Sequence, residues 1–145
     1  MDIVIVTDFY GIIGESSRSR FQYLADKLAK RHNVEIITSD FCHEKKQHYT
    51  MPYPSENRKL TILHEIGYKK NISIKRILAH ALWGRNVANY LKKRKKPDVI
   101  YCAIPTLTAA YLAGRICCKR KIKFIIDIQD LWPEAFMMLL KKNIL

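Results

Sequence analysis

Ile3-Val4-Ile5-Val6-Thr7, close to the start of the chain, is a continuous apolar run dominated by β-branched residues. Such a run predicts a strand buried on both faces, as the strands of parallel sheets are. A loop with glycines and serines follows, then a helical pattern over Arg20–Arg31 and a second apolar run at Val34–Thr38. Strand, loop, helix and strand in this order form a βαβ unit, which joins two parallel strands.

The rest of the chain repeats this alternation of strands and helices. Residues 40–59 contain two prolines and no clear period, so we expect a long loop there. The whole pattern predicts one α/β domain over residues 1–145, a Rossmann-like doubly wound parallel sheet with strand order 3-2-1-4-5. The further strands are expected at Leu60–His64, Val99–Cys102 and Lys123–Asp127, and the last of them is expected to be buried. Further helices are expected over Asn71–Lys96, Thr106–Lys121 and Glu134–Lys142. Thr106 or Thr108 is expected to be the N-cap of the second of these helices.

Positive charge is concentrated in the middle of the chain. The formal net charge is +13, and residues 67–126 hold fifteen basic side chains but only one acidic one. The densest cluster is Lys92, Lys93, Arg94, Lys95 and Lys96. This segment predicts either an ordinary solvated face or binding to an anionic membrane surface. The absence of any RNP, KH or helix-turn-helix pattern argues against nucleic acid as the partner.

Cysteine and histidine spacing gives no sign of a metal site. The four cysteines lack ligand spacing, and none of the five histidines pairs with Asp, Glu or Cys in a ligand motif. We therefore expect no metal, and four free thiols in a reducing cytoplasm.

Two loops at the expected carboxyl ends of strands carry the candidate binding residues, because ligands of open α/β sheets bind there. In the first loop, Gly11, Gly14 and Ser16 offer backbone N–H groups to a phosphate, although the glycines can equally serve turn geometry alone. Arg20 stands at a helix start, where a cation opposes the helix dipole. That position favours an anionic partner or a surface salt bridge.

The second loop, Asp127-Ile-Gln-Asp-Leu-Trp-Pro-Glu134, is acidic and aromatic, an unusual choice for a purely structural turn. If both loops meet at the point where the strand order reverses, one edge of the sheet gathers the candidate residues. We expect that edge to hold Gly14, Arg20, Pro105, Asp130 and Glu134.

On these motifs the chain resembles the N-terminal domain of family 4 glycosyltransferases of the GT-B fold, in particular the WbuB-like enzymes of bacterial capsule and O-antigen synthesis. The resemblance covers almost the whole chain. It rests on the first strand, the glycine-serine loop, Arg20–Leu28, Val34–Phe41 with His43, Pro97–Tyr101 and, most specifically, Asp127–Glu134.

The resemblance implies an acceptor-side domain of an enzyme that moves a sugar from a nucleotide-sugar to a lipid-linked saccharide, without a cofactor. Such an enzyme works as a peripheral protein at the cytoplasmic face of the bacterial plasma membrane. A C-terminal donor-binding domain is absent from this chain, so we expect the chain alone to be inactive. The residues it implies for substrate binding are Gly11, Gly14, Ser16, Arg20, Pro105, Gln129, Asp130, Trp132 and Glu134. No catalytic residue is assigned, since Gln129 replaces the histidine of many relatives and cannot carry a proton.

Alternatives remain open at this stage. The chain could be a non-enzymatic Rossmann-like binding module that acts through its basic face, or part of a nucleotide-binding oxidoreductase, which the missing third glycine of the dinucleotide fingerprint disfavours. The apolar residues at 136–145 predict docking of a missing domain or self-association.

Overall fold

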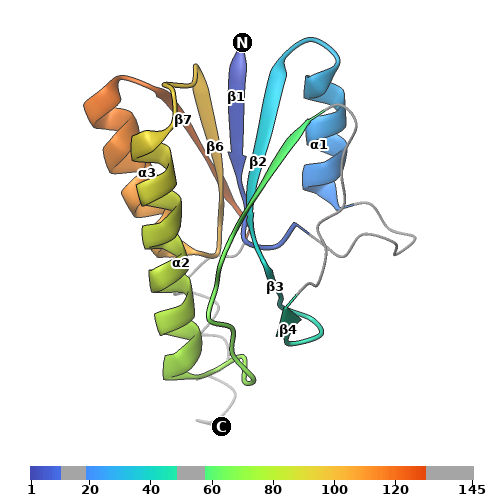
Figure 1. Ribbon diagram of the computed structural model, residues 1–145, viewed down its shortest axis with the longest axis vertical. Coiled ribbons are helices and arrows are strands. Elements are labelled where there is room, and N and C mark those ends of the chain that lie inside the picture. The colour runs from blue at the N-terminus through green and yellow to red at the C-terminus, as the bar shows by residue number, and fades with distance from the viewer. Residues whose placement is uncertain (11–18, 49–57, 130–145) are drawn as a thin grey trace, which may run out of the picture.

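The computed structural model describes residues 1–10, 19–48 and 58–129, and the expected helix Glu134–Lys142 lies outside them. Five parallel strands form the main sheet in the order β5-β2-β1-β6-β7 (Figure 1). This order is equivalent to 3-2-1-4-5 and confirms the Rossmann-like α/β fold predicted from the sequence. The strands are β1 (Asp2–Val6), β2 (Asn33–Ser39), β5 (Lys59–Leu63), β6 (Val99–Ile104) and β7 (Lys123–Ile128).

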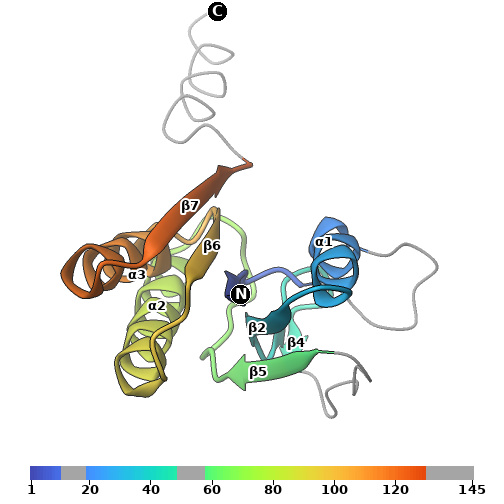
Figure 2. The same cartoon turned by 90° about the horizontal axis from the view of Figure 1, so that it is seen from above.

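Three helices cover the two faces of this sheet. In Figure 2, α1 (Arg20–Ala29) lies on one face, whereas α2 (Ile74–Lys93) and α3 (Leu107–Arg120) lie on the other. One core cluster joins Val4 and Val6 of β1 to Trp83 of α2, and a second joins Ile5 of β1 to Phe21 of α1. Because β1 is packed on both faces, it reads as a continuous apolar run in the sequence.

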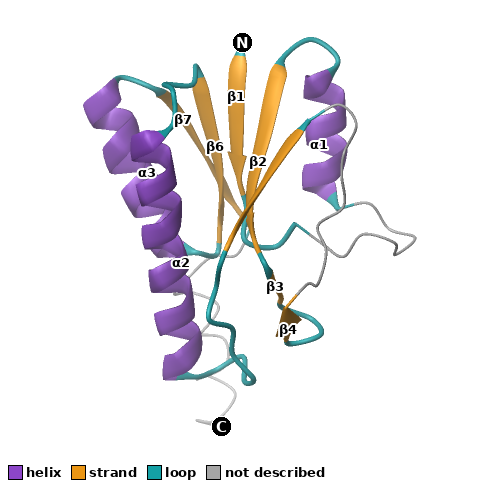
Figure 3. Ribbon diagram, viewed as in Figure 1, coloured by secondary structure: helices purple, strands orange, loops and turns teal. Residues whose placement is uncertain are grey.

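Figure 3 shows where the described helices begin and end, and local interactions account for two of these points. The Ser19 hydroxyl accepts a hydrogen bond from the Gln22 backbone N–H at 3.3 Å, and the Gln22 side chain accepts one from the Ser19 N–H. This capping box starts α1. Helix α2 ends at Lys93, three residues before the expected end, because Arg94 takes an extended conformation.

Helices α2 and α3 approach each other closely at Gly84. A Cβ atom built on Gly84 would lie 2.7 Å from the backbone nitrogen of Ala109. Only glycine allows this approach, and it lets the two helices bury a shared set of small side chains, including Ala109 and Ala113.

Two expectations about individual segments were wrong. The interval 40–59 was expected to be a loop, but it contains an antiparallel hairpin of β3 (Phe41–Cys42) and β4 (Gln47–His48). These two-residue strands are too short to produce a periodic pattern, and burial of Phe41 against Tyr68 and Ala79 anchors them instead.

The expectation of a fully buried last strand was also wrong. Within the described part of the chain, β7 pairs only with β6 and forms an edge of the sheet. Ile125 and Ile126, which point to opposite faces, are 49% and 48% exposed.

Candidate functional site at the carboxyl edge of the sheet

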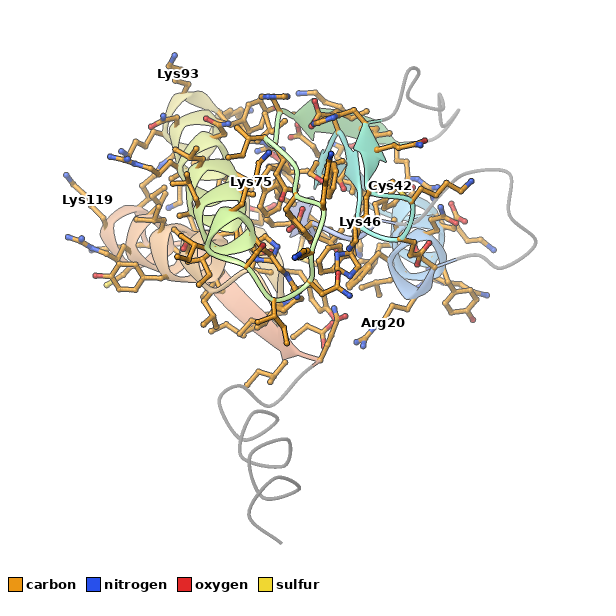
Figure 4. The ribbon with its side chains drawn as sticks, turned by 90° about the horizontal axis from the view of Figure 1, so that it is seen from below. Arg20, Cys42, Lys46, Lys75, Lys93 and Lys119 are labelled. Carbon is orange, nitrogen blue, oxygen red and sulfur yellow. The ribbon has the colours of Figure 1, made fainter. Side chains whose placement is uncertain are left out.

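The carboxyl ends of the parallel strands form the lower edge of the sheet in Figure 1, and Figure 4 views the molecule from that side. Three of the sequence-predicted site residues lie at this edge: Arg20 begins α1, Pro105 follows β6, and Gln129 follows β7. Gly11, Gly14, Ser16, Asp130, Trp132 and Glu134 lie outside the described residues.

At this edge an ion pair joins the start of α1 to the end of β7. The Arg20 Nη2 atom lies 2.7 Å from Asp127 Oδ2 at the end of β7. Burial and the neighbouring Asp127 carboxylate both raise the pKa of Tyr101 on the adjacent strand β6. The Arg20 side chain is still 58% exposed, so its guanidinium remains accessible to an anionic ligand.

A second polar group at the same edge is buried and was not expected from the sequence. Asp8 follows β1, Glu65 follows β5, and His80 comes from α2. Asp8 and Glu65 are only 4% and 1% exposed. The Thr106 hydroxyl, after β6, donates to Asp8 Oδ2 at 2.8 Å, and His80 Nε2 lies 3.7 Å from the same oxygen. We call Asp8, Glu65 and His80 the buried triad.

Burial and mutual repulsion set the protonation of the buried triad. The pKa of Glu65 is raised to about 9, first by burial and then by the charge of Asp8. Burial lowers the pKa of His80, although the Asp8 carboxylate opposes this effect. These shifts favour the protonated form of Glu65 and the neutral form of His80.

Aromatic side chains border the triad. The Phe9 ring lies 4.9 Å from His43 and 6.2 Å from His80, centroid to centroid. The Tyr68 hydroxyl is 2.5 Å from His43 Nδ1, and the Lys46 ammonium, labelled in Figure 4, lies 4.9 Å from the centre of the Tyr68 ring. Burial and the positive charge of Lys46 lower the pKa of His43 to about 4, so this imidazole is neutral as well.

Sequence reasoning missed the triad because its members stand at positions 8, 65 and 80, far apart in the chain. A signal did exist for two of them, since Asp8 and Glu65 each stand two residues beyond the end of a parallel strand. Thr106 was expected as an N-cap. It occupies that position, but it makes no side-chain cap bond, because its hydroxyl bonds Asp8 instead.

The basic cluster expected to be exposed contains four exposed lysines and one largely buried arginine. Lys92, Lys93, Lys95 and Lys96 are exposed near the end of α2, at the opposite edge of the sheet. Arg94 differs from the surface residue that we expected, because its side chain is only 12% exposed and binds Glu35 and Asp2. A groove of about 810 Å³ beside α2 and α3 gathers further basic side chains, namely Arg85, Lys92, Arg115, Lys119 and Arg120.

The outer side of α2 exposes apolar side chains at its first turns. Ile74, Ile77 and Leu78 are 84%, 71% and 50% exposed. With Arg85 and Lys92 they form one helical stripe, apolar in its first half and basic in its second. We call these five residues the α2 stripe.

The fold and the edge site define a Rossmann-like α/β domain with a five-stranded parallel sheet. No protein-family model matches the sequence, and no curated protein is significantly similar to it. Among the described residues, no helix combines the length and apolar character needed to cross a membrane.

Proposed function

We propose that this chain is the acceptor-side domain of a GT-B glycosyltransferase, which moves a sugar from a nucleotide-sugar to a lipid-linked saccharide in bacterial surface-polysaccharide synthesis. The proposed domain works as a peripheral protein at the anionic inner face of the plasma membrane. In the proposed enzyme a separate donor-binding domain supplies the nucleotide site, and we infer that the acceptor-side domain alone is inactive. The observation that carries the proposal is the exposed α2 stripe, whose apolar half begins at the carboxyl edge of a Rossmann-like sheet.

The α2 stripe has the composition of a helix that lies on a membrane. Its exposed isoleucines suit the boundary between headgroups and acyl chains, and its basic half suits anionic headgroups. Each lysine or arginine close to such a surface contributes about 1 kcal/mol. The neighbouring Lys93, Lys95 and Lys96 add to the same attraction.

The carboxyl edge supplies the second support. Helix α2 begins at this edge, so a lipid-linked acceptor held at the membrane would present its diphosphate and sugar close to the loops after β1, β6 and β7. Arg20 is an exposed cation at this edge, and its planar guanidinium suits bidentate contact with a phosphate.

Vesicle co-sedimentation tests the membrane part of the proposal. The chain should bind anionic vesicles, bind neutral vesicles poorly, and lose binding as salt screens the charge. Two variants separate the two halves of the interaction: Ile74→Asn with Ile77→Asn removes apolar contact, and Lys92, Lys93, Lys95 and Lys96→Gln removes charge. Each should weaken binding. Equal binding to neutral and anionic vesicles, or no effect of either variant, would contradict membrane association.

Acceptor recognition needs its own experiment. Anionic vesicles doped with an isoprenyl-diphosphate-linked saccharide should bind the chain more tightly than undoped vesicles of equal charge. Arg20→Ala should abolish this difference, whereas the control Arg31→Ala, an exposed arginine at the other end of α1, should not. If the doped lipid adds nothing, or if both arginines matter equally, the acceptor site is wrong.

The second candidate is a non-enzymatic binding module that acts through its basic face. The basic groove beside α2 and α3 favours it, because several cations converge there without a carboxylate in the lining. Substitution of Arg115 and Lys119 by Gln separates the two functions. Loss of binding to a soluble polyanion such as heparin, with doped-vesicle binding intact, would assign the groove to another partner.

A further inference from the structure

The buried triad leaves three ligand atoms without hydrogen-bond partners in the described part of the chain. These atoms are Asp8 Oδ1, Glu65 Oε1 and His80 Nε2. One ligand atom from each of the three side chains lies within 4.8 Å of the others. Buried polar atoms are normally paired, because an unpaired one costs about 1–3 kcal/mol. Three side chains that lie this close together, each with an unpaired buried atom, therefore point to a missing partner.

We propose that Asp8, Glu65 and His80 bind one divalent transition-metal ion at the carboxyl edge of the sheet. Two carboxylate oxygens and one imidazole nitrogen form a mixed set suited to manganese, iron, cobalt or zinc. The separations are compatible with one ion contacting all three side chains after small rotamer adjustments. Three protein ligands also leave a coordination position for water or a substrate oxygen.

The surroundings of the triad support a cation. The Thr106 hydroxyl donates to Asp8 Oδ2, and the Thr38 and Ser39 hydroxyls donate to the Asp8 carbonyl oxygen at 3.3 and 3.4 Å. These bonds orient the aspartate in the manner of the outer contacts that position metal ligands. Arg76 lies close enough to lower the pKa of His80, yet among the described residues it forms no ion pair with Asp8 or Glu65.

A proton is the competing occupant. Shared between Asp8 and Glu65, a proton relieves the repulsion between the two carboxylates and accounts for the high pKa of Glu65. It leaves His80 Nε2 without a partner, however. A metal ion satisfies all three side chains at once, and at neutral pH it binds by displacing the proton from Glu65.

Manganese is the best probe, because Mn²⁺ prefers carboxylate and imidazole ligands to the thiolates of the four cysteines. Free Mn²⁺ is measured by electron paramagnetic resonance during titration of the purified chain. Wild-type protein should bind one Mn²⁺ ion. Glu65→Gln, Asp8→Asn and His80→Gln should each weaken binding by at least about tenfold, since even loss of an outer contact costs that much.

A control variant addresses the other group of potential ligands, Asp40, His48 and His64, of which both histidines are exposed. His64→Gln should leave Mn²⁺ binding unchanged. Folding of each variant is checked by circular dichroism. Glu65→Gln should fold, because the amide has the shape of the acid and can donate to Asp8. Mn²⁺ should also raise the melting temperature of the wild type but not of Glu65→Gln.

Each result of the Mn²⁺ titration either supports the proposed site or overturns it. One Mn²⁺ site that is lost in Glu65→Gln and kept in His64→Gln establishes the triad as the ligand set. Binding that is lost in His64→Gln and kept in Glu65→Gln moves the site to the exposed group and overturns the proposal. Folded wild-type protein that binds no Mn²⁺ also overturns it, and leaves a shared proton as the occupant of the triad.

Discussion

Replacing Glu35 by glutamine should destabilise the fold in a pH-dependent manner. Glu35 is the third residue of β2, near the amino edge of the sheet, and its side chain is only 3% exposed. Arg94 Nε lies 2.5 Å from one carboxylate oxygen, and Lys59 Nζ lies 3.0 Å from the other. The Thr61 hydroxyl donates at 2.6 Å, and the Tyr90 hydroxyl also donates to Glu35.

These contacts set the size of the effect. Burial alone would raise the pKa of Glu35, but the hydrogen bonds from Thr61, Tyr90, Arg94 and Lys59 outweigh it and lower the pKa from 4.5 to about 2. At about 1.4 kcal/mol for each tenfold change in proton affinity, ionised Glu35 contributes at most roughly 3 kcal/mol. Because the folded pKa is the lower one, this contribution is complete above pH 4.5 and is lost as the pH falls toward 2.

Urea unfolding followed by circular dichroism between pH 7 and pH 3 measures the effect. Glu35→Gln resembles the protonated side chain, so the difference from wild type should approach about 3 kcal/mol at pH 7 and shrink steadily below pH 4.5. The exposed Glu44→Gln is the matched control and should stay within about 0.5 kcal/mol throughout. A Glu35→Gln difference that does not change with pH would refute the reasoning.

Three further predictions concern the helix contact, the thiols and the exposed apolar surface. Gly84→Ala should cost about 1–3 kcal/mol in urea unfolding, because its Cβ meets the Ala109 backbone at 2.7 Å, whereas Gly114→Ala, which meets only the Phe124 ring at 3.1 Å, should cost less. Iodoacetamide should label exposed Cys118 first in the native protein, because Cys102 and Cys117 are buried and their pKa values are raised to about 12 and 11. Equal labelling of the three thiols in mass spectrometry would contradict this prediction. Residues 136–145 and the exposed isoleucines of β7 should promote self-association, and a concentration-independent monomer in light scattering would count against it.

The main sheet was predictable because each strand has its own strong local signal. The runs at Ile3–Thr7 and Val34–Thr38 are rich in β-branched apolar residues, and the βαβ order then restricts the topology to few choices. The hairpin of β3 and β4 was not predictable in this way. Its stability comes from Phe41 packing on Tyr68, a contact between positions 27 residues apart that no local pattern records.

The exposed face of α2 was not predictable, for a related reason. Helical spacing places Ile74, Ile77 and Leu78 on one face, but spacing alone cannot say what covers that face. The buried face belongs to Ala79, Trp83 and Val87 instead, because Gly84 directs that side toward α3. Likewise, Arg94 was counted with the exposed lysines around it, since its partners Asp2 and Glu35 are distant in sequence.

The two buried glutamates show how structure separates a stabilising polar cluster from a candidate binding site. Glu35 and Glu65 are similarly inaccessible, yet their pKa values move in opposite directions, to about 2 and about 9. At Glu35, donors and cations meet both carboxylate oxygens, so ionisation favours folding. At Glu65 the neighbour is another carboxylate, and orphaned ligand atoms remain. The unpaired atoms lie at the carboxyl edge, where α/β domains place their ligands, and this is why the cluster around Glu65 is proposed as a binding site and the one around Glu35 is not.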